Sequence, residues 1–403
     1  MQKITVPILL YSYILTETII PFLASLLILG NILFLGKLLP LFDLIINFRV
    51  NPLDFLKLCI YLTPNLLLYA IPMASMLGVI LCFSRMVADN EIIALKSVGI
   101  GTNNLLPPIT VFAVVTAALT LYIGTGLIPT STIATEKLLF KIATEKFDKG
   151  LKENQFGQGI GKVVFYIDRI KPDSHKWQGI YLSDTRDSRN PMIITAARGQ
   201  FTAKPEQLLL QVTLKDGSIH RTIQEEPGKE LSETIQFEKY SLNLPLRYPQ
   251  FLDSDKSVAF GKKAMTQKEL LAFAEKHEPG NEEAISKMIE YHKRLVLAVG
   301  CFLLTVLGLP LAIRSRPGAK TVALPFGLVL FILYYILLTG GKAAAEKNAG
   351  IAVSMWTPNL LFGILTVYLL ATKDKKSESL LVSCILRPLT HIYNRIKQRK
   401  GRL

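Results

Sequence analysis

Two blocks of apolar sequence, each long enough for three membrane spans, dominate this chain of 403 residues and are separated by the polar stretch 128–294. A helix that crosses a bilayer needs roughly 17–25 mainly apolar residues. Six segments meet that requirement or come close to it: 10–36, 58–83, 105–128, 295–313, 321–340 and 352–371. This layout predicts an integral membrane protein that carries one large domain outside the bilayer.

The net charge of +15 is concentrated beside the apolar segments. Residues 128–290 hold 24 basic and 23 acidic side chains, whereas the rest of the chain holds 22 basic and 8 acidic ones. An excess of Lys and Arg that flanks membrane spans is the pattern of the positive-inside rule. The distribution therefore argues against a nucleic-acid partner.

Short basic segments indicate which way the chain crosses the membrane. The turn 314–320 contains three basic residues and no acid, and the tail 372–403 contains nine basic residues against two acids. With six spans, both segments lie on the same side as the N-terminus and the segment 84–101. The positive-inside rule places that side in the cytoplasm. The N- and C-termini are then cytoplasmic and the insert is outside, which is the periplasm of a Gram-negative cell.

The insert alternates like β-structure. Strand-like runs occupy 163–167, 179–182, 192–195, 208–214 and 235–242. Asp216-Gly217 predicts a hairpin turn that joins 208–214 to 218–222. Short strands with Gly and Pro between them favour a sandwich or jelly roll, and the flanks 131–149 and 266–294 favour helices.

The predicted fold is therefore α-helical and membrane-integral, with six transmembrane helices and an inserted all-β domain that is jelly-roll-like. Its parts are spans one to three (1–130), the β domain with helical flanks (131–290), spans four to six (291–371) and a basic tail (372–403).

No segment has the pattern of a nucleotide-binding loop. The nearest candidate, Gly161-Lys162, lacks both the earlier glycine and the following Ser or Thr. No two cysteines have metal-site spacing and the five histidines are scattered, so we predict no catalytic residue, no metal ligand and no bound cofactor. Energy for any work must come from a gradient or from another subunit.

The segment 84–101 predicts a cytoplasmic helix of about four turns. Arg85 and Asp89 are spaced for an i,i+4 ion pair, and Gly99 or Gly101 supplies the stop. The pattern suits either a simple amphipathic connector or a contact site for another protein.

Basic residues also occur near the outer boundary, where the positive-inside rule expects fewer. They are Lys37, Arg49, Lys57, Lys293, Arg294 and Lys342. They suit either snorkelling anchors or a collar for the phosphate or carboxylate groups of an anionic lipid. The spans have almost no ionisable group away from their predicted ends, which argues against an ion-coupled carrier.

Several motifs, in this order around a β-rich insert, resemble the LptF/LptG family, the permeases of the lipopolysaccharide export transporter, and are more similar to the LptF subfamily. They are 13–18 (Tyr-Ile-Leu-Thr-Glu-Thr), 71–78 (Ile-Pro-Met-Ala-Ser-Met-Leu-Gly), 90–99 (Asn-Glu-Ile-Ile-Ala-Leu-Lys-Ser-Val-Gly), 308–311 (Gly-Leu-Pro-Leu), 316–318 (Arg-Pro-Gly) and 356–360 (Trp-Thr-Pro-Asn-Leu).

The resemblance implies an inner-membrane permease subunit that extracts lipopolysaccharide. Its implied partners are an LptG-like paralogous permease, an LptB-like ATPase dimer that uses ATP and Mg²⁺, and LptC/LptA-like periplasmic β-domain proteins. The segment 84–101 would be the coupling helix. Glu91 matches the acidic position of the family there, and Arg85, Asp89 and Asn90 would accompany it at the ATPase. The basic collar would bind the lipid.

Two other classes of function remain open from the sequence. One is a membrane-anchored scaffold whose outer β-domain only binds partners, and the other is a lipid transporter that is not driven by ATP.

Overall fold

The computed structural model divides the chain into two compact units. The helical unit contains Met1–Gly36, Pro64–Leu127 and Thr266–Leu403, and the β unit contains Lys37–Thr63 and Ile128–Met265. The residues that the structure describes are 8–48, 51–150, 153–158, 163–171, 176–185, 191–204, 209–226, 229–245, 261–277, 281–314, 323–347 and 350–372. Within these residues, six helical segments are long and apolar enough to cross a membrane, which confirms the predicted six spans.

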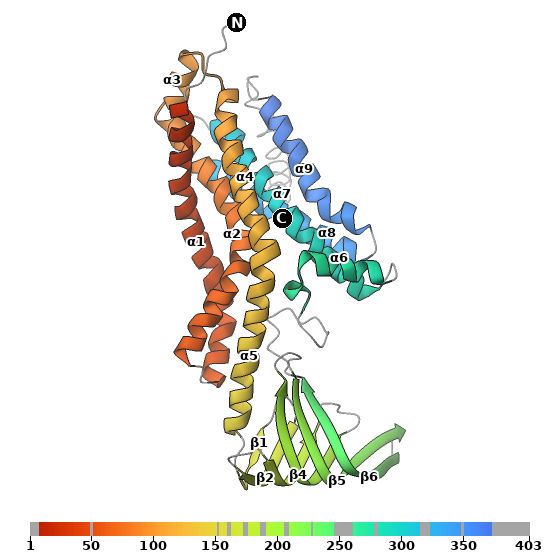
Figure 1. Ribbon diagram of the computed structural model, residues 1–403. Coiled ribbons are helices and arrows are strands. Elements are labelled where there is room, and N and C mark those ends of the chain that lie inside the picture. The colour runs from red at the N-terminus through yellow and green to blue at the C-terminus, as the bar shows by residue number, and fades with distance from the viewer. Residues whose placement is uncertain are drawn as a thin grey trace, which may run out of the picture. The chain divides into compact units, whose positions relative to one another are not determined.

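The helices of Figure 1 have the following bounds: α1 Ile8–Phe48, α2 Pro52–Ala88, α3 Glu91–Ser97, η1 Thr102–Leu105, α4 Leu106–Tyr122, the π-helical turn η2 Ile123–Leu127, α5 Ile128–Gly150, η3 Lys262–Ala264, α6 Gln267–Lys276, α7 Glu282–Ile313, α8 Ala323–Glu346 and α9 Ile351–Ala371. The predicted helical flank 131–149 is present as α5, which continues the third span. Residues 37–57, which separate the predicted spans 10–36 and 58–83, are mostly helical, because α1 runs on through Phe48 and α2 begins at Pro52.

Helices α2 and α7 lie at the centre of their bundle. In the most apolar 18-residue stretch of each of these helices, 78% of the stretch is buried by the rest of the protein, whereas only 11% of the corresponding stretch of α1 is buried. Phe22 of α1 packs edge-on against Phe112 of α4, with ring centroids 5.4 Å apart. A Cβ on Gly78 of α2 would lie only 2.9 Å from the Cα of Phe22, so glycine is the residue that lets α1 approach α2 this closely.

Polar side chains inside the bundle are hydrogen-bonded to one another. The Tyr334 hydroxyl of α8 donates to Asn359 Oδ1 of α9 at 2.8 Å. Asn359 Nδ2 in turn donates to the carbonyl oxygen of Val296 on α7 at 3.0 Å. These bonds join three helices where no water is available to satisfy polar groups.

The described part of the β unit contains one antiparallel sheet whose six strands are neighbours in chain order. The strands are β1 Phe156–Gln158, β2 Val163–Lys171, β3 Lys176–Asp184, β4 Met192–Lys204, β5 Leu209–Glu226 and β6 Lys229–Pro245. The all-β character of the insert is confirmed. Within the described residues the strand order is an up-and-down meander in a single sheet, and the jelly-roll-like arrangement stays a prediction.

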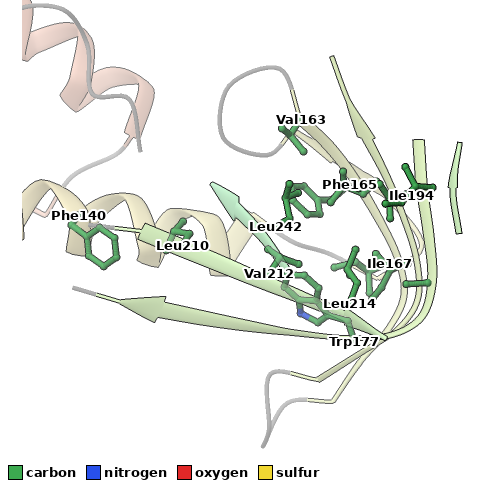
Figure 2. Close-up of a cluster of buried hydrophobic side chains, with 14 residues drawn as sticks. Phe140, Val163, Phe165, Ile167, Trp177, Ile194, Leu210, Val212, Leu214 and Leu242 are labelled. Atoms are coloured by element: carbon green, nitrogen blue, oxygen red, sulfur yellow. The ribbon is translucent and has the colours of Figure 1, made fainter. Parts of the chain in front are cut away.

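A single buried apolar cluster fills the inside of this sheet. Figure 2 shows the strands curving around side chains that include Phe165, Trp177, Val212 and Leu214, with Phe140 contributed by α5. A smaller cluster joins α5 to α2 through Leu138, Leu139, Ile142 and Leu58. The apolar residues of the predicted strands therefore point to one inner face.

The sheet bends along one row of residues that crosses it from β2 to β6. The residues of this row are Asp168, Gly179, Ala197, Asp216 and Glu238, and they lie between the paired rows on either side. Two members have a positive φ, +62° for Gly179 and +55° for Asp216. In each strand, the residue of this row shifts the alternation of inward- and outward-facing side chains by one position. The apolar side chains on both sides of the bend therefore still face the core.

The predicted hairpin turn at Asp216-Gly217 is wrong, because β5 runs without interruption from Leu209 to Glu226. Asp216 nevertheless has a left-handed backbone, with φ +55°. It bends a long strand instead of reversing the chain, since a positive φ serves a bulge as well as a turn.

Candidate coupling and lipid-binding sites

The short helix α3 is set off from α2 by a tight turn. Helix α2 ends at Ala88, and Asn90 has φ +58°, a left-handed conformation that Asn tolerates better than most residues. At the other end, Ile100 N–H donates to the carbonyl of Leu95 and Gly99 N–H to that of Lys96. This pair of bonds, with Gly99 at φ +87°, is a Schellman C-cap.

Part of the prediction for 84–101 is therefore wrong. The segment is not one helix of four turns, because Asp89-Asn90 breaks it and only Glu91–Ser97 forms the separate helix α3. The predicted stop at Gly99 is confirmed by its capping bonds.

Side chains of α1 contact the α3 segment directly. The Tyr13 hydroxyl donates to both carboxylate oxygens of Glu91, at 3.1 and 3.2 Å. The Arg85 guanidinium lies 2.8 Å from Glu17 Oε2 and 3.9 Å from Asp89 Oδ2. These contacts bring Arg85, Asp89 and Glu91 together. Figure 1 shows α3 beside the N-terminal end of α1. Sequence patterns did not reveal Tyr13, since nothing in its spacing points to Glu91.

The outer face of α3 is partly apolar. Ile93 is 56% exposed and Val98 71% exposed, whereas Ile92 is buried beneath them. Exposed apolar residues on a short capped helix that projects from the bundle make a small docking surface, with the Glu91 carboxylate beside it.

The predicted lipid-binding residues of α7 are not at an open rim. Arg294 is fully buried at 0% exposure, and its Nε lies 3.4 Å from Oε1 of Glu290, which is 3% exposed. Lys293 Nζ contacts the other oxygen of the same carboxylate. These cations lie directly before the predicted span 295–313, as expected, and their role in lipid binding stays a prediction. The apolar run begins at Leu295, but protein rather than solvent covers the turn before it.

Gly124 of the π-turn η2 lies against Arg294. A Cβ added there would be 3.6 and 3.7 Å from Cβ and Cγ of Arg294. The aliphatic part of the arginine thus packs on the irregular turn of the third span. Such π-turns are frequent at functional sites.

Lys57 of α2, in the β unit, also shares a carboxylate with a second cation. It lies 3.9 Å from Asp54, and Lys141 of α5 lies 3.9 Å from the other oxygen of Asp54. Asp54 is buried, whereas both lysines are exposed. Lys37 of α1 is exposed, and Arg49 is outside the described residues.

Three of the predicted lipid-binding cations therefore share a carboxylate with a second cation, which leaves each set of three groups with a net charge of about +1. Sequence analysis missed the two acids, Asp54 and Glu290. The available signal was the spacing, since Asp54 precedes Lys57 by three residues and Glu290 precedes Lys293 and Arg294 by three and four. In the part of the chain that the structure describes, no three His, Cys, Asp or Glu side chains gather as metal ligands. The basic tail 373–403 is outside that part.

A bundle of six apolar helices interrupted by an antiparallel β domain defines a polytopic membrane protein with one large extramembrane insert. Comparison with family models makes the class specific. The model of the lipopolysaccharide export system permease LptF/LptG matches residues 12–372, so the chain belongs to that family.

Curated relatives include the lipopolysaccharide export system permease protein LptF of Escherichia coli K12, of E. coli O157:H7 and of Shigella flexneri. Each is 21% identical over 370 residues, which cover 89% of this chain and 93% of the relative. The similarity and the apolar helices together support a multi-pass protein of the inner membrane.

Proposed function

We propose that this chain is the LptF-like, non-catalytic permease subunit of an ATP-driven transporter that extracts lipopolysaccharide from the inner membrane and passes it to a periplasmic bridge. The observation that carries the proposal is the family match, which runs through both helical blocks and the insert. An LptG-like permease, an LptB-like ATPase dimer and LptC/LptA-like β-domain proteins would be its partners. In this proposal the N- and C-termini are cytoplasmic and the insert is periplasmic.

The α3 segment would receive the movement of the ATPase. Ile93 and Val98 offer apolar side chains to a groove of the partner, and Glu91 offers a charge beside them. Because Tyr13 and Glu17 of α1 bond to Glu91 and Arg85, a push on α3 would reach the first span as well as the second. Hinge and shear movements of packed helices are the usual form of such transmission.

Helix α1 offers an apolar face to a second permease, since its most apolar stretch is 11% buried against 28–78% in the other candidate spans of the described residues. Its side chains Ile20, Leu27 and Leu35 are each at least 60% exposed although they belong to a span. In a bilayer this face meets either lipid or another helix. We place the LptG-like partner here, with the lipid entering between the two chains.

The β unit would receive the lipid. Its bent sheet turns apolar side chains to a single inner face, a surface that suits acyl chains. The 17-residue strand β6 is at the edge of the sheet that the described residues form, and a strand at a sheet edge suits pairing with a further β-domain.

The test is charge reversal at α3 in the full complex, co-expressed with a paralogous permease and a candidate ATPase and reconstituted in liposomes. Glu91→Lys should lower lipopolysaccharide-dependent ATP hydrolysis and lipid release by at least about tenfold, because a reversed charge at a protein interface costs on the order of 1.4 kcal/mol or more. The control is Glu346→Lys, a charge reversal at an exposed acid on α8, away from α3 in the sequence. Tyr13→Phe removes only the hydrogen bond between Tyr13 and Glu91. Its effect shows how much of the loss in Glu91→Lys comes from that bond and how much comes from the contact with the ATPase.

Retention of coupled ATP hydrolysis in Glu91→Lys, within twofold of wild type, would refute the driven-permease role of α3. A membrane-anchored scaffold would then be the better description.

One observation favours a second candidate. The buried Glu290–Arg294 pair is an ionisable group inside a candidate span, a feature of ion-coupled carriers. Loss of transport on adding an uncoupler at constant ATP would support that carrier, and unchanged transport would exclude it.

A further inference from the structure

Helices α7 and α9 are joined by hydrogen bonds near both ends of α9. Toward the N-terminal end, Trp356 Nε1 donates to Nδ1 of His292 on α7 at 3.4 Å. Toward the other end, the guanidinium of Arg314, the residue after α7, donates to the carbonyl oxygen of Leu369 at 3.1 Å. The two helices therefore run in the same direction from one bonded level to the other.

Between these levels the helices leave a groove of about 700 Å³, which we call the α7–α9 groove. Gly363 is one of its lining residues, and a Cβ added there would meet only the methyl groups of Leu303, at 4.0 Å. The walls are apolar side chains from one stripe of each helix, namely Val299, Leu303, Leu360, Ile364 and Val367. The three from α9 are each at least 61% exposed.

The surroundings of the α7–α9 groove favour an apolar occupant. Both helices are candidate membrane spans. Asn359 also lines the groove, but its amide is already bonded to Tyr334 and to the backbone of Val296, so the walls offer few partners to water. An empty groove would forfeit the dispersion contacts of its walls. A chain of apolar atoms from a lipid or from another protein therefore fills it in a membrane.

The dimensions of the groove fit one acyl chain. Trp356 and Tyr368 line its two ends and are twelve positions apart on α9, which is about 18 Å of helix. One leaflet of a bilayer contributes about 15 Å of hydrocarbon. A chain that enters from one membrane surface would thus fill most of the groove. A third helix, about 10–12 Å across, is too wide to enter between two helices that are bonded at both ends.

The end of the groove at Trp356 also offers a partner to a polar head. Trp is frequent at the boundary between membrane and water. Because Trp356 donates to Nδ1 of His292, a neutral imidazole has its hydrogen on Nε2. Among the described residues Nε2 has no hydrogen-bond partner, so it can donate to a phosphate or ester oxygen of a lipid.

We propose that the α7–α9 groove binds one acyl chain of a glycerophospholipid whose head lies beside His292 and Trp356. The bilayer is as apolar as the groove, so burial alone does not draw the chain in. The preference comes from contacts with both helices along the chain and from the bond at its head. The bound lipid fills the space that Gly363 leaves and holds α9 against α7. This site is independent of the proposed export of lipopolysaccharide.

The test uses the full chain in nanodiscs that contain phosphatidylethanolamine with a photoreactive group on one palmitoyl chain. Labelled residues are identified by mass spectrometry after illumination. Labelling of 360–367 should exceed that of 20–27 on α1 at least fivefold, since α1 meets lipid without a groove. A photoreactive group at the methyl end of the chain should label 364–368, and one beside the ester should label 356–360.

Variants that fill the groove supply the second arm. Gly363→Leu places a side chain on the floor and should lower labelling of 299–303 at least fivefold. Gly340→Leu is the matched control, because a Cβ at this position of α8 would meet nothing within 4 Å, and labelling should stay within twofold of wild type. Val299→Trp fills the groove from α7 and serves, with labelling read at 360–367, if Gly363→Leu does not fold.

Equal labelling of 360–367 and 20–27 would show ordinary contact with the bilayer and overturn the inference. Unchanged labelling in both filled variants would do the same. The reverse order of labelling along the chain would overturn the position of the head. Stronger labelling by lipid A that carries the same photoreactive group would overturn the choice of ligand. Loss of labelling when a paralogous permease and a candidate ATPase are co-expressed would show that a protein covers the groove, which also overturns the inference.

Discussion

Replacement of Gly300 by alanine tests the packing of α7, α8 and α9. A Cβ at this position would lie 1.9 Å from the Tyr334 hydroxyl oxygen, 2.6 Å from Cζ and 3.2 Å from Asn359 Oδ1. Tyr334 is completely buried, so its ring has no free space into which to move. The substitution must therefore push α8 away from α7 or displace the ring.

The expected cost has two parts. Overpacking of a filled core costs about 1–3 kcal/mol. Displacing the ring also breaks the bond from Tyr334 to Asn359, which contributes about 0.5–1.5 kcal/mol. Gly300→Ala should therefore lower the free energy of unfolding by about 1.5–4.5 kcal/mol.

The assay is equilibrium unfolding of the full chain in mixed detergent micelles, followed by tryptophan fluorescence. Gly363→Ala is the matched control, because the nearest side-chain atoms to a Cβ there are the Leu303 methyl groups at 4.0 Å. In a Tyr334→Leu background the cost of Gly300→Ala should fall to below about 1 kcal/mol, since the clashing ring is gone. If Gly300→Ala and Gly363→Ala differ by less than about 0.5 kcal/mol, the packing argument fails.

Three further substitutions test the bend of the sheet and the end of α9. Gly179→Val should destabilise the β unit by about 2–4 kcal/mol, because its Cβ would lie 2.7 Å from that of Asp168 at a positive φ. Asp216→Gly should change stability by less than about 1 kcal/mol, since relief of the left-handed conformation offsets the loss of an exposed ion pair. Both are measured by the thermal loss of β circular dichroism, and equal effects would contradict the role of the row. Arg314→Ala should cost about 1–2 kcal/mol, because the guanidinium donates to the Leu369 carbonyl at the C-terminus of α9, and unchanged unfolding in detergent would refute this.

The six spans were predictable because hydropathy is a local property, and an apolar run of sufficient length has few alternatives to a membrane helix. The strands were predictable as runs for the same reason. Their connections were not. Asp216-Gly217 specifies a left-handed backbone, but whether such a residue reverses or bends the chain depends on the partner strands beside it. The break in the segment 84–101 was missed for a similar reason, because Asp89-Asn90 is a typical turn pair inside an otherwise helical pattern.

The charged residues show most clearly what could not be predicted from the sequence. The sequence places Lys293 and Arg294 correctly at the start of an apolar run, and the spacing to Glu290 is visible in it. A solvated helix with that spacing would give a weak surface pair worth a few tenths of a kcal/mol. When these side chains are buried, the acid is as important as the cations, because an uncompensated charge costs far more free energy there than in water. Burial comes from α4 and η2, which are more than 160 residues away in the chain. A count of cations at a membrane boundary therefore overstates the net charge there, because acids that are close in sequence share those cations.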